Sequence, residues 1–227
     1  MMRSAANGFR SLWLVVVIAA VLSLAACGGG GAGEGQSPTP ADETAGVEPE
    51  DLDALMLQAA DLPQDFSYDV TSEVLTLADL SDPQQRTAGR HLRSLLEESL
   101  QGEGKTVCIV SDLELYASAE AAAARLTEEW QVTEGIAAAV PAEEGVLEKL
   151  DLPTIGDETS GFTLSAPRVN FCGWESVQAE VVSLTFRKGE LLADIRTYTL
   201  GQGASTDQAI ELARKLLARI EAGLGEQ

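Results

Sequence analysis

Apolar residues recur every three or four positions in several segments of the chain, the spacing typical of amphipathic helices. This pattern predicts a short helical segment at residues 51–60 and a helix at residues 84–100. It also predicts helices at 119–134, after the N-cap residue Ser118, and at 205–223. Ser205 and Gln208 form the S-x-x-Q pattern of a capping box, which supports a helix start there.

Other segments alternate between apolar and polar residues, as half-buried strands do. Strands are predicted at 66–77, 106–116, 177–187 and 191–200, and the last two are joined by a tight turn at Lys188 and Gly189. Helices and strands are mixed without a strict β-α-β alternation. We therefore expect an α+β fold over residues 51–227, with an antiparallel sheet and helices packed on one face, as a single domain.

The first 26 residues have the organisation of an export signal. Arg3 and Arg10 precede an apolar run at 12–22, and small residues follow before Cys27. The apolar stretch of residues 12–26 is shorter than the roughly 20 residues that a membrane-spanning helix needs. The residues Leu24-Ala25-Ala26-Cys27 resemble the lipobox of bacterial lipoproteins. This resemblance implies that residues 1–26 are removed and that Cys27 is lipidated; the alternative is an ordinary cleaved signal with a chance cysteine.

Residues 27–50 are rich in glycine, proline and acid and lack apolar periodicity, which predicts a flexible tether. The formal net charge of the whole chain is −21. So acidic a chain is repelled by nucleic acid and by anionic lipid headgroups. We therefore expect no nucleic-acid partner, and membrane contact only through the lipid anchor. The expected location is the extracytoplasmic face of the bacterial plasma membrane, where the partner is an unidentified ligand or envelope protein.

Setting Cys27 aside leaves Cys108 and Cys172 as an even pair. An oxidising compartment favours a disulfide between them, and two buried free thiols are the alternative. Such a bridge would close a loop of about 64 residues, which contributes about 4 kcal/mol in the chain-entropy treatment.

Three further segments carry a second resemblance: AADLPQDF at 59–66, LPTIGDETSGF at 152–162, and the C-terminal run at 186–220. They resemble bacterial extracytoplasmic lipoprotein and sensor-type domains, including the extracellular sensor domains of mycobacterial serine/threonine kinases. The resemblance implies a fold and a location, not a ligand. Those sensor domains typically carry two disulfides, whereas this chain has one cysteine pair available.

Sequence motifs for catalysis are missing. The chain contains no G-x-S-x-G, H-E-x-x-H, P-loop or C-x-x-C pattern, and His91 is its only histidine. Gly201 and Gly203 fit a turn into a capped helix better than a dinucleotide-binding loop. Among the acid pairs, only Gly156-Asp157-Glu158 calls for inspection, because a turn aspartate commonly caps backbone groups. We expect no enzyme activity, no cofactor and no metal.

Two surfaces remain as candidate binding sites. The first is a basic strip on the predicted 84–100 helix, formed by Arg86, Arg90, His91 and Arg93. It would receive an anionic ligand or, alternatively, pair with neighbouring acids. The second is Phe171 and Trp174, which flank Cys172. They form either a recognition edge or, as we favour, aromatic packing over a disulfide.

These observations predict a non-enzymatic, membrane-anchored lipoprotein that binds a ligand or protein. Two alternatives stay open: an exported hydrolase that uses two carboxylates on cell-envelope polymers, and a structural envelope assembly factor.

Overall fold

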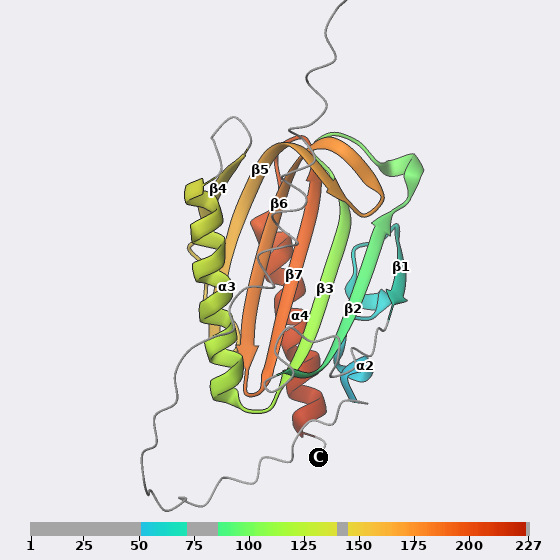
Figure 1. The fold of residues 1–227 in the computed structure, drawn as a ribbon. Coiled ribbons are helices and arrows are strands. Elements are labelled where there is room, and N and C mark those ends of the chain that lie inside the picture. Colours follow the sequence, from blue (N-terminus) through green and yellow to red (C-terminus); the bar gives the residue numbers. More distant parts are fainter. Residues whose placement is uncertain (1–50, 72–85, 140–144, 226–227) are drawn as a thin grey trace, which may run out of the picture. The chain divides into compact units, whose positions relative to one another are not determined.

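The computed structural model describes residues 51–71, 86–139 and 145–225, which belong to one compact unit. Cys27 and the predicted signal and tether lie outside these residues. Seven strands form one antiparallel sheet in the order β1-β2-β3-β7-β6-β5-β4 (Figure 1). The strands are β1 (Phe66–Thr71), β2 (Arg86–Leu96), β3 (Thr106–Tyr116), β4 (Val146–Lys149), β5 (Glu158–Phe171), β6 (Trp174–Lys188) and β7 (Leu191–Leu200).

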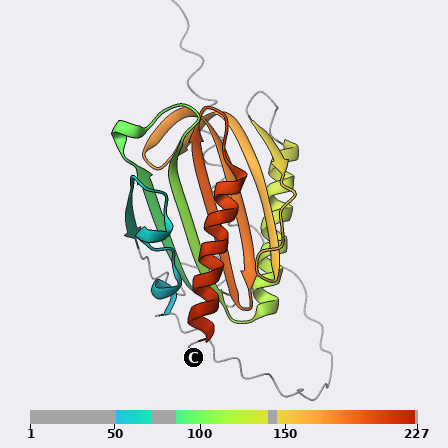
Figure 2. The ribbon, with the colours of Figure 1, turned by 180° about the vertical axis from the view of Figure 1, so that it is seen from behind.

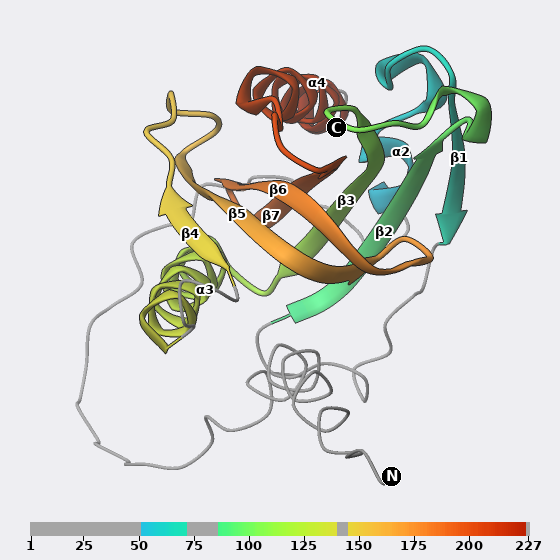
Figure 3. The same cartoon turned by 90° about the horizontal axis from the view of Figure 1, so that it is seen from above.

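Two long helices cover opposite faces of this sheet. α3 (Ala119–Ala139) lies in front of it in Figure 1, and α4 (Thr206–Gly225) lies in front in Figure 2, which shows the other side. Figure 3 shows the sheet edge-on between them. The expected α+β arrangement, with helices packed on one face, is therefore wrong. A single seven-stranded sheet dominates the fold. The helices lie on opposite faces because the chain leaves the sheet toward one side after β3 and toward the other side after β7.

Short helical turns complete the described chain: α2 (Leu52–Leu55), η3 (Ala59–Asp61) and η4 (Glu98–Leu100). Both predicted helix starts are confirmed, since Ser118 and Ser205 each accept a hydrogen bond from a backbone N–H three residues later, at 3.2 Å. Within the described ranges, no helix combines the length and the hydrophobicity needed to cross a bilayer.

The predicted helix at 84–100 is wrong, because most of this segment is strand β2. Ala88, Leu92 and Leu96 are buried at a spacing of four. That spacing fits one face of a helix but is also a multiple of two, so it fits one face of a strand equally well. Gly89 within the segment further disfavours a helix.

The face of the sheet beneath α4 carries the main apolar core. Leu212, Leu216 and Ile220 of α4 pack with buried strand residues such as Ile195 and Leu184. The N-terminal turn joins this core through Leu52, Leu55, Met56 and Leu57, all of them buried. Residues 52–57 are therefore an integral part of the fold.

Candidate functional site

The other face of the sheet, on the side of α3, carries a row of polar side chains across five strands. The row consists of His91, Asp112, Asp194, Thr185 and Ser160, which are successive partners in the strand register from β2 to β5. This face belongs to the α3 side because Leu192, two residues before Asp194 on β7, packs against Ala122 and Leu126 of α3. We call these five residues the polar row.

Two aspartates of the polar row face each other, an arrangement that is unfavourable for like charges on neighbouring strands. Arg196 lies between them and compensates for it. Its Nε lies 2.6 Å from Oδ2 of Asp194, and its Nη2 donates a hydrogen bond to Oδ2 of Asp112. Ser183 and Thr185 donate hydrogen bonds to Oδ1 of Asp194, at 3.2 and 3.0 Å. A single guanidinium thus joins two carboxylates.

The two aspartates differ in their electrostatic surroundings. Burial acts to raise the pKa of Asp112, but the hydrogen bond from His91 and the charge of Arg196 outweigh it, so its pKa lies below the ordinary value. Burial raises the pKa of Asp194; Arg196 opposes this effect and the facing Asp112 adds to it. Burial acts to lower the pKa of Arg196, but the two carboxylates prevail and raise it, so it stays charged.

His91 closes the polar row at its solvent-exposed end. Its Nδ1 hydrogen-bonds to Oδ1 of Asp112, and because an ionised carboxylate can only accept, Nδ1 carries the proton. The side chain of His91 is 42% exposed, against 24% for Asp112 and 36% for Arg196. Solvent, and therefore a dissolved ligand, can reach this end of the row.

The β5–β6 hairpin tip lies on the same face of the sheet. Cys172 and Gly173 form its two-residue turn with φ of 48° and 91°, the left-handed values of a tight hairpin turn. A disulfide joins Cys172 to Cys108 of β3, with 6.5 Å between the Cα atoms. Phe171 stacks on Tyr198 of β7, with ring centroids 4.6 Å apart. Tyr198 lies two residues after Arg196 on the same face of β7, which places the tip next to the polar row.

Helix α3 packs on the same face of the sheet and brings further charges near the polar row. Arg125 pairs with Glu128 and Glu129, each at 3.0 Å. Burial raises the pKa of Glu129; Arg125 opposes this effect, and the negative charge of Asp194 adds to it. Glu129 is therefore close enough to interact electrostatically with the row.

The structure separates the residues of the predicted basic strip, because neighbours on a strand point to opposite faces. Arg86 pairs with Glu114, and His91 belongs to the polar row. Arg93 is exposed, at the next position on the same face as His91. Arg90 points to the other face, is 7% exposed, and binds Asp53 with an Nε–Oδ1 distance of 2.6 Å. The four residues do not form one surface.

The aromatic pair predicted around Cys172 contributes to an apolar cluster. Phe171 is buried and Trp174 is half-buried, and both pack with Cys108 and Cys172. Sequence reasoning missed Asp112, Asp194 and Arg196. The signal was a charged residue at every second position of two otherwise apolar strands, as in the Asp194-Ile195-Arg196 segment.

The acidic turn at Gly156-Asp157-Glu158 is structural. Oδ2 of Asp157 accepts hydrogen bonds from the backbone N–H of Gly189 at 2.8 Å and from Arg187 at 3.1 Å, which fixes the β6–β7 turn. Among the described parts of the chain, no group of three or more His, Cys, Asp or Glu side chains is placed to hold a metal ion.

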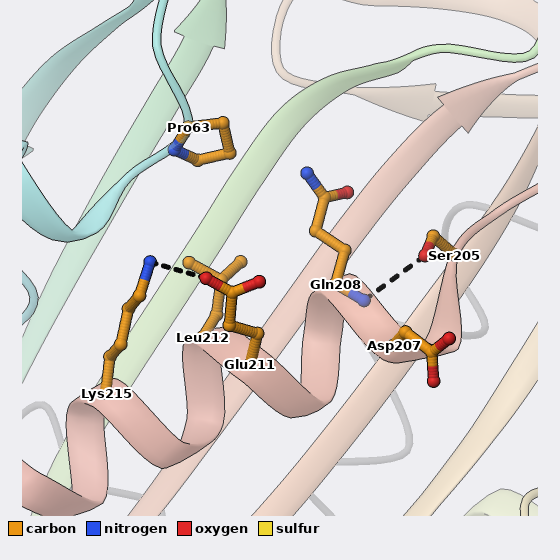
Figure 4. A pocket seen from close by; sticks show the side chains of 7 residues that line it. All are labelled: Pro63, Ser205, Asp207, Gln208, Glu211, Leu212 and Lys215. Carbon is orange, nitrogen blue, oxygen red and sulfur yellow. Dashed lines mark hydrogen bonds and ion pairs between the residues drawn. The ribbon is translucent and has the colours of Figure 1, made fainter.

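A hollow of about 480 Å³ lies between α4 and the loop that carries Pro63 (Figure 4). Its lining consists of Pro63, Ser205, Asp207, Gln208, Glu211, Leu212 and Lys215. Glu211 and Lys215 pair with each other at 2.8 Å, and Ser205 caps the helix. This ion pair is largely exposed, whereas the aspartates of the polar row are more deeply buried and costlier to hold, so the polar row is the stronger candidate site.

Comparison with known proteins identifies a fold but no family. No protein-family model matches the chain, and no curated protein matches it. Among solved structures, the extracellular domain of PknH from Mycobacterium tuberculosis superposes with a TM-score of 0.54 at 13% identity, over 79% of this chain and 99% of that chain. The described domain therefore resembles the extracellular domain of a kinase in its fold.

Proposed function

We propose that the protein is an extracytoplasmic lipoprotein, anchored through a lipid on Cys27, whose domain binds a small charged ligand at the polar row and has no catalytic activity. Three observations support the location: the lipobox-like residues before Cys27, the Cys108–Cys172 disulfide, and a fold like that of an extracellular domain. An oxidising compartment is where such disulfides persist.

The binding function is carried by one observation, the joining of Asp112 and Asp194 by Arg196 on a solvent-accessible sheet face. Facing carboxylates reduce stability, and apolar side chains would pack such a face at lower cost. The row presents a guanidinium, an imidazole and carboxylates, each partly exposed. Such a set is suited to a ligand that carries charged donors and acceptors.

The same geometry argues against the carboxylate-based hydrolase. Each of the four oxygens of Asp112 and Asp194 already accepts a hydrogen bond or an ion pair. A general acid or a nucleophile must direct a carboxylate oxygen at the substrate. Both aspartates are instead held by Arg196 and its neighbours.

The test of binding is a thermal-shift screen of the full chain in detergent against amino acids, polyamines, sugar acids and sugar phosphates. A ligand of the polar row raises the Tm of the wild type, and His91→Gln and Asp112→Asn each weaken its affinity about tenfold, the effect of losing one charged hydrogen bond. Arg214→Gln, on the exposed side of α4, is the matched control and leaves affinity unchanged. Equal affinity in all four proteins would refute binding at this row.

Anchoring is tested separately by growing cells with a labelled fatty acid. The wild-type protein takes up the label and partitions with membranes, since two or more acyl chains give stable anchoring. Label retained by Cys27→Ser would refute the anchoring proposal. Cys172→Ser serves as the control, because it replaces a cysteine outside the lipobox and should leave the labelling unchanged.

A further inference from the structure

The tip of the β5–β6 hairpin is held separately from the rest of the sheet. β5 pairs regularly with β6 from Glu158↔Arg187 to Ala166↔Ala179, and the register then shifts twice before the turn. Cys172 and Ser176 both adopt positive φ, of 48° and 53°, which is unfavourable for residues other than glycine. Pairing within the ladder therefore does little to fix this tip against the sheet.

A covalent bond and a set of apolar contacts fasten the tip to the sheet face. The covalent bond is the disulfide, in which Cys108 is fully buried on β3 while Cys172 is half-buried at the turn. The apolar contacts are the stacking of Phe171 on Tyr198 and the packing of Val169, Trp174 and Val177 on the same cluster. Tyr198 lies two residues after Arg196 on the same face of β7, so the position of the tip acts on the surroundings of the cation that joins Asp112 and Asp194.

We infer that the Cys108–Cys172 disulfide is a redox-controlled latch, which fastens the hairpin tip beside the polar row when oxidised and releases it when reduced. Its effect on ligand binding rests on the function proposed above, whereas the release of the tip does not. Oxidised, the latch fixes Tyr198 and Arg196 in one arrangement. Reduced, the tip moves away from β7, and Tyr198 beside Arg196 loses the stacked ring of Phe171.

The reaction requires an extracytoplasmic dithiol as the reductant. One of its thiolates attacks Sγ of Cys172, the more exposed sulfur, and the S–S bond breaks as Cys108 leaves as a thiolate and takes up a proton. The second thiolate of the reductant then displaces Cys172 from the mixed disulfide, and Cys172 is protonated in turn. The protein gains two electrons and two protons, and the dithiol becomes a disulfide.

Release remains local because the sheet around the latch is paired independently of it. β3 pairs with β7, and β7 pairs with β6 from Ala179↔Leu200 to Lys188↔Leu191. This pairing is made by backbone groups and does not depend on the disulfide bond. The core under α4 lies on the opposite face of the sheet. Opening the disulfide therefore frees the tip without unfolding the domain.

Hydrogen exchange of the full chain in detergent tests the latch, with and without millimolar dithiothreitol. Reduction should raise exchange about tenfold in peptides covering residues 167–178, while peptides from α4 change less than about twofold. His91 is the only histidine in the chain, so its single imidazole NMR signal reports on the polar row and should shift on reduction. Dithiothreitol should have no effect on Cys108→Ser/Cys172→Ser.

The wild type alone keeps the test decisive if that double variant fails to fold, because reoxidation should restore the original exchange and imidazole signal. Phe171→Leu keeps the disulfide, so its tip stays protected while the His91 signal shifts. Unchanged exchange at 167–178 on reduction, or equally faster exchange in α4, overturns the latch. Neither result bears on the ligand screen, which is run on the oxidised protein.

Discussion

Arg196 holds the polar row together, and its replacement by glutamine should destabilise the domain by about 2–3 kcal/mol. Removing one partner of a fully buried ion pair costs about 3–5 kcal/mol, but 36% of this side chain reaches solvent, which reduces the loss. Two carboxylates about 5 Å apart on neighbouring strands repel by about 3 kcal/mol at an effective dielectric constant of 20. Both arguments give the same magnitude.

The pH dependence of this loss distinguishes charge repulsion from lost packing. In the wild type, the lowered pKa of Asp112 stabilises the fold above the unfolded value near 3.9, and this contribution is lost as pH falls through the folded pKa. The raised pKa of Asp194 acts oppositely, since its effect on stability is most favourable at low pH and is lost as pH rises through the folded value. Without Arg196, both folded pKa values rise. The loss of unfolding free energy caused by Arg196→Gln should therefore become smaller as the pH falls from about 7.5 to about 5.

Urea unfolding of the full chain, followed by circular dichroism at both pH values, measures this effect. Adding Asp194→Asn to Arg196→Gln removes the repulsion and should restore at least about 1 kcal/mol at the higher pH. A loss below about 1 kcal/mol, or one that does not change with pH, would show that Arg196 does not offset the facing aspartates.

Two further substitutions test the fold around the site. Gly156→Ala should lower stability by more than about 2 kcal/mol in urea unfolding, because Gly156 has φ of +66° and a Cβ there would lie 2.3 Å from the carbonyl oxygen of Arg187. Gly173→Ala is the control, with no atom within 4 Å of its Cβ, and should lose only about 1 kcal/mol from its positive φ; equal losses would contradict the packing argument. Leu216→Ala should cost about 2–5 kcal/mol by leaving a cavity under α4, whereas a cost near that of exposed Arg214→Ala, within about 0.5 kcal/mol, would contradict the assigned core.

Local pattern was sufficient to predict several elements of the fold. The predicted strands at 106–116 and 191–200 match β3 and β7 at both ends, and the predicted helices at 119–134 and 205–223 coincide with most of α3 and α4. The error at 84–100 arose because a spacing of four satisfies both a helix and a strand. The positions of α3 and α4 on opposite faces depend on how each connection leaves the sheet, which hydrophobic periodicity does not encode.

The polar row could be predicted only in part. The alternation of Asp194 and Arg196 with buried Ile195 indicates that the two charges share one face of a strand. Their partner Asp112 lies 84 positions away from Arg196 in the sequence, and it becomes a neighbour only because β3 pairs with β7. Strand order is a property of the assembled sheet. A residue pattern can therefore indicate that a strand face is charged, but not which charged faces meet.

The two faces of the same strands have separate tasks, and this division explains how a chain without a recognisable catalytic motif can still carry a specific site. On β7, Ala193 and Ile195 pack under α4, while Asp194 and Arg196 lie on the opposite face with the polar row. The apolar face supplies stability through α4 and the N-terminal turn, which leaves the other face free to hold facing carboxylates at a cost that the core offsets. The disulfide joins the hairpin tip to the polar-row face alone. Changes in the tip therefore act first on Tyr198, the neighbour of Arg196 on β7, while the core beneath α4 keeps the strands in register.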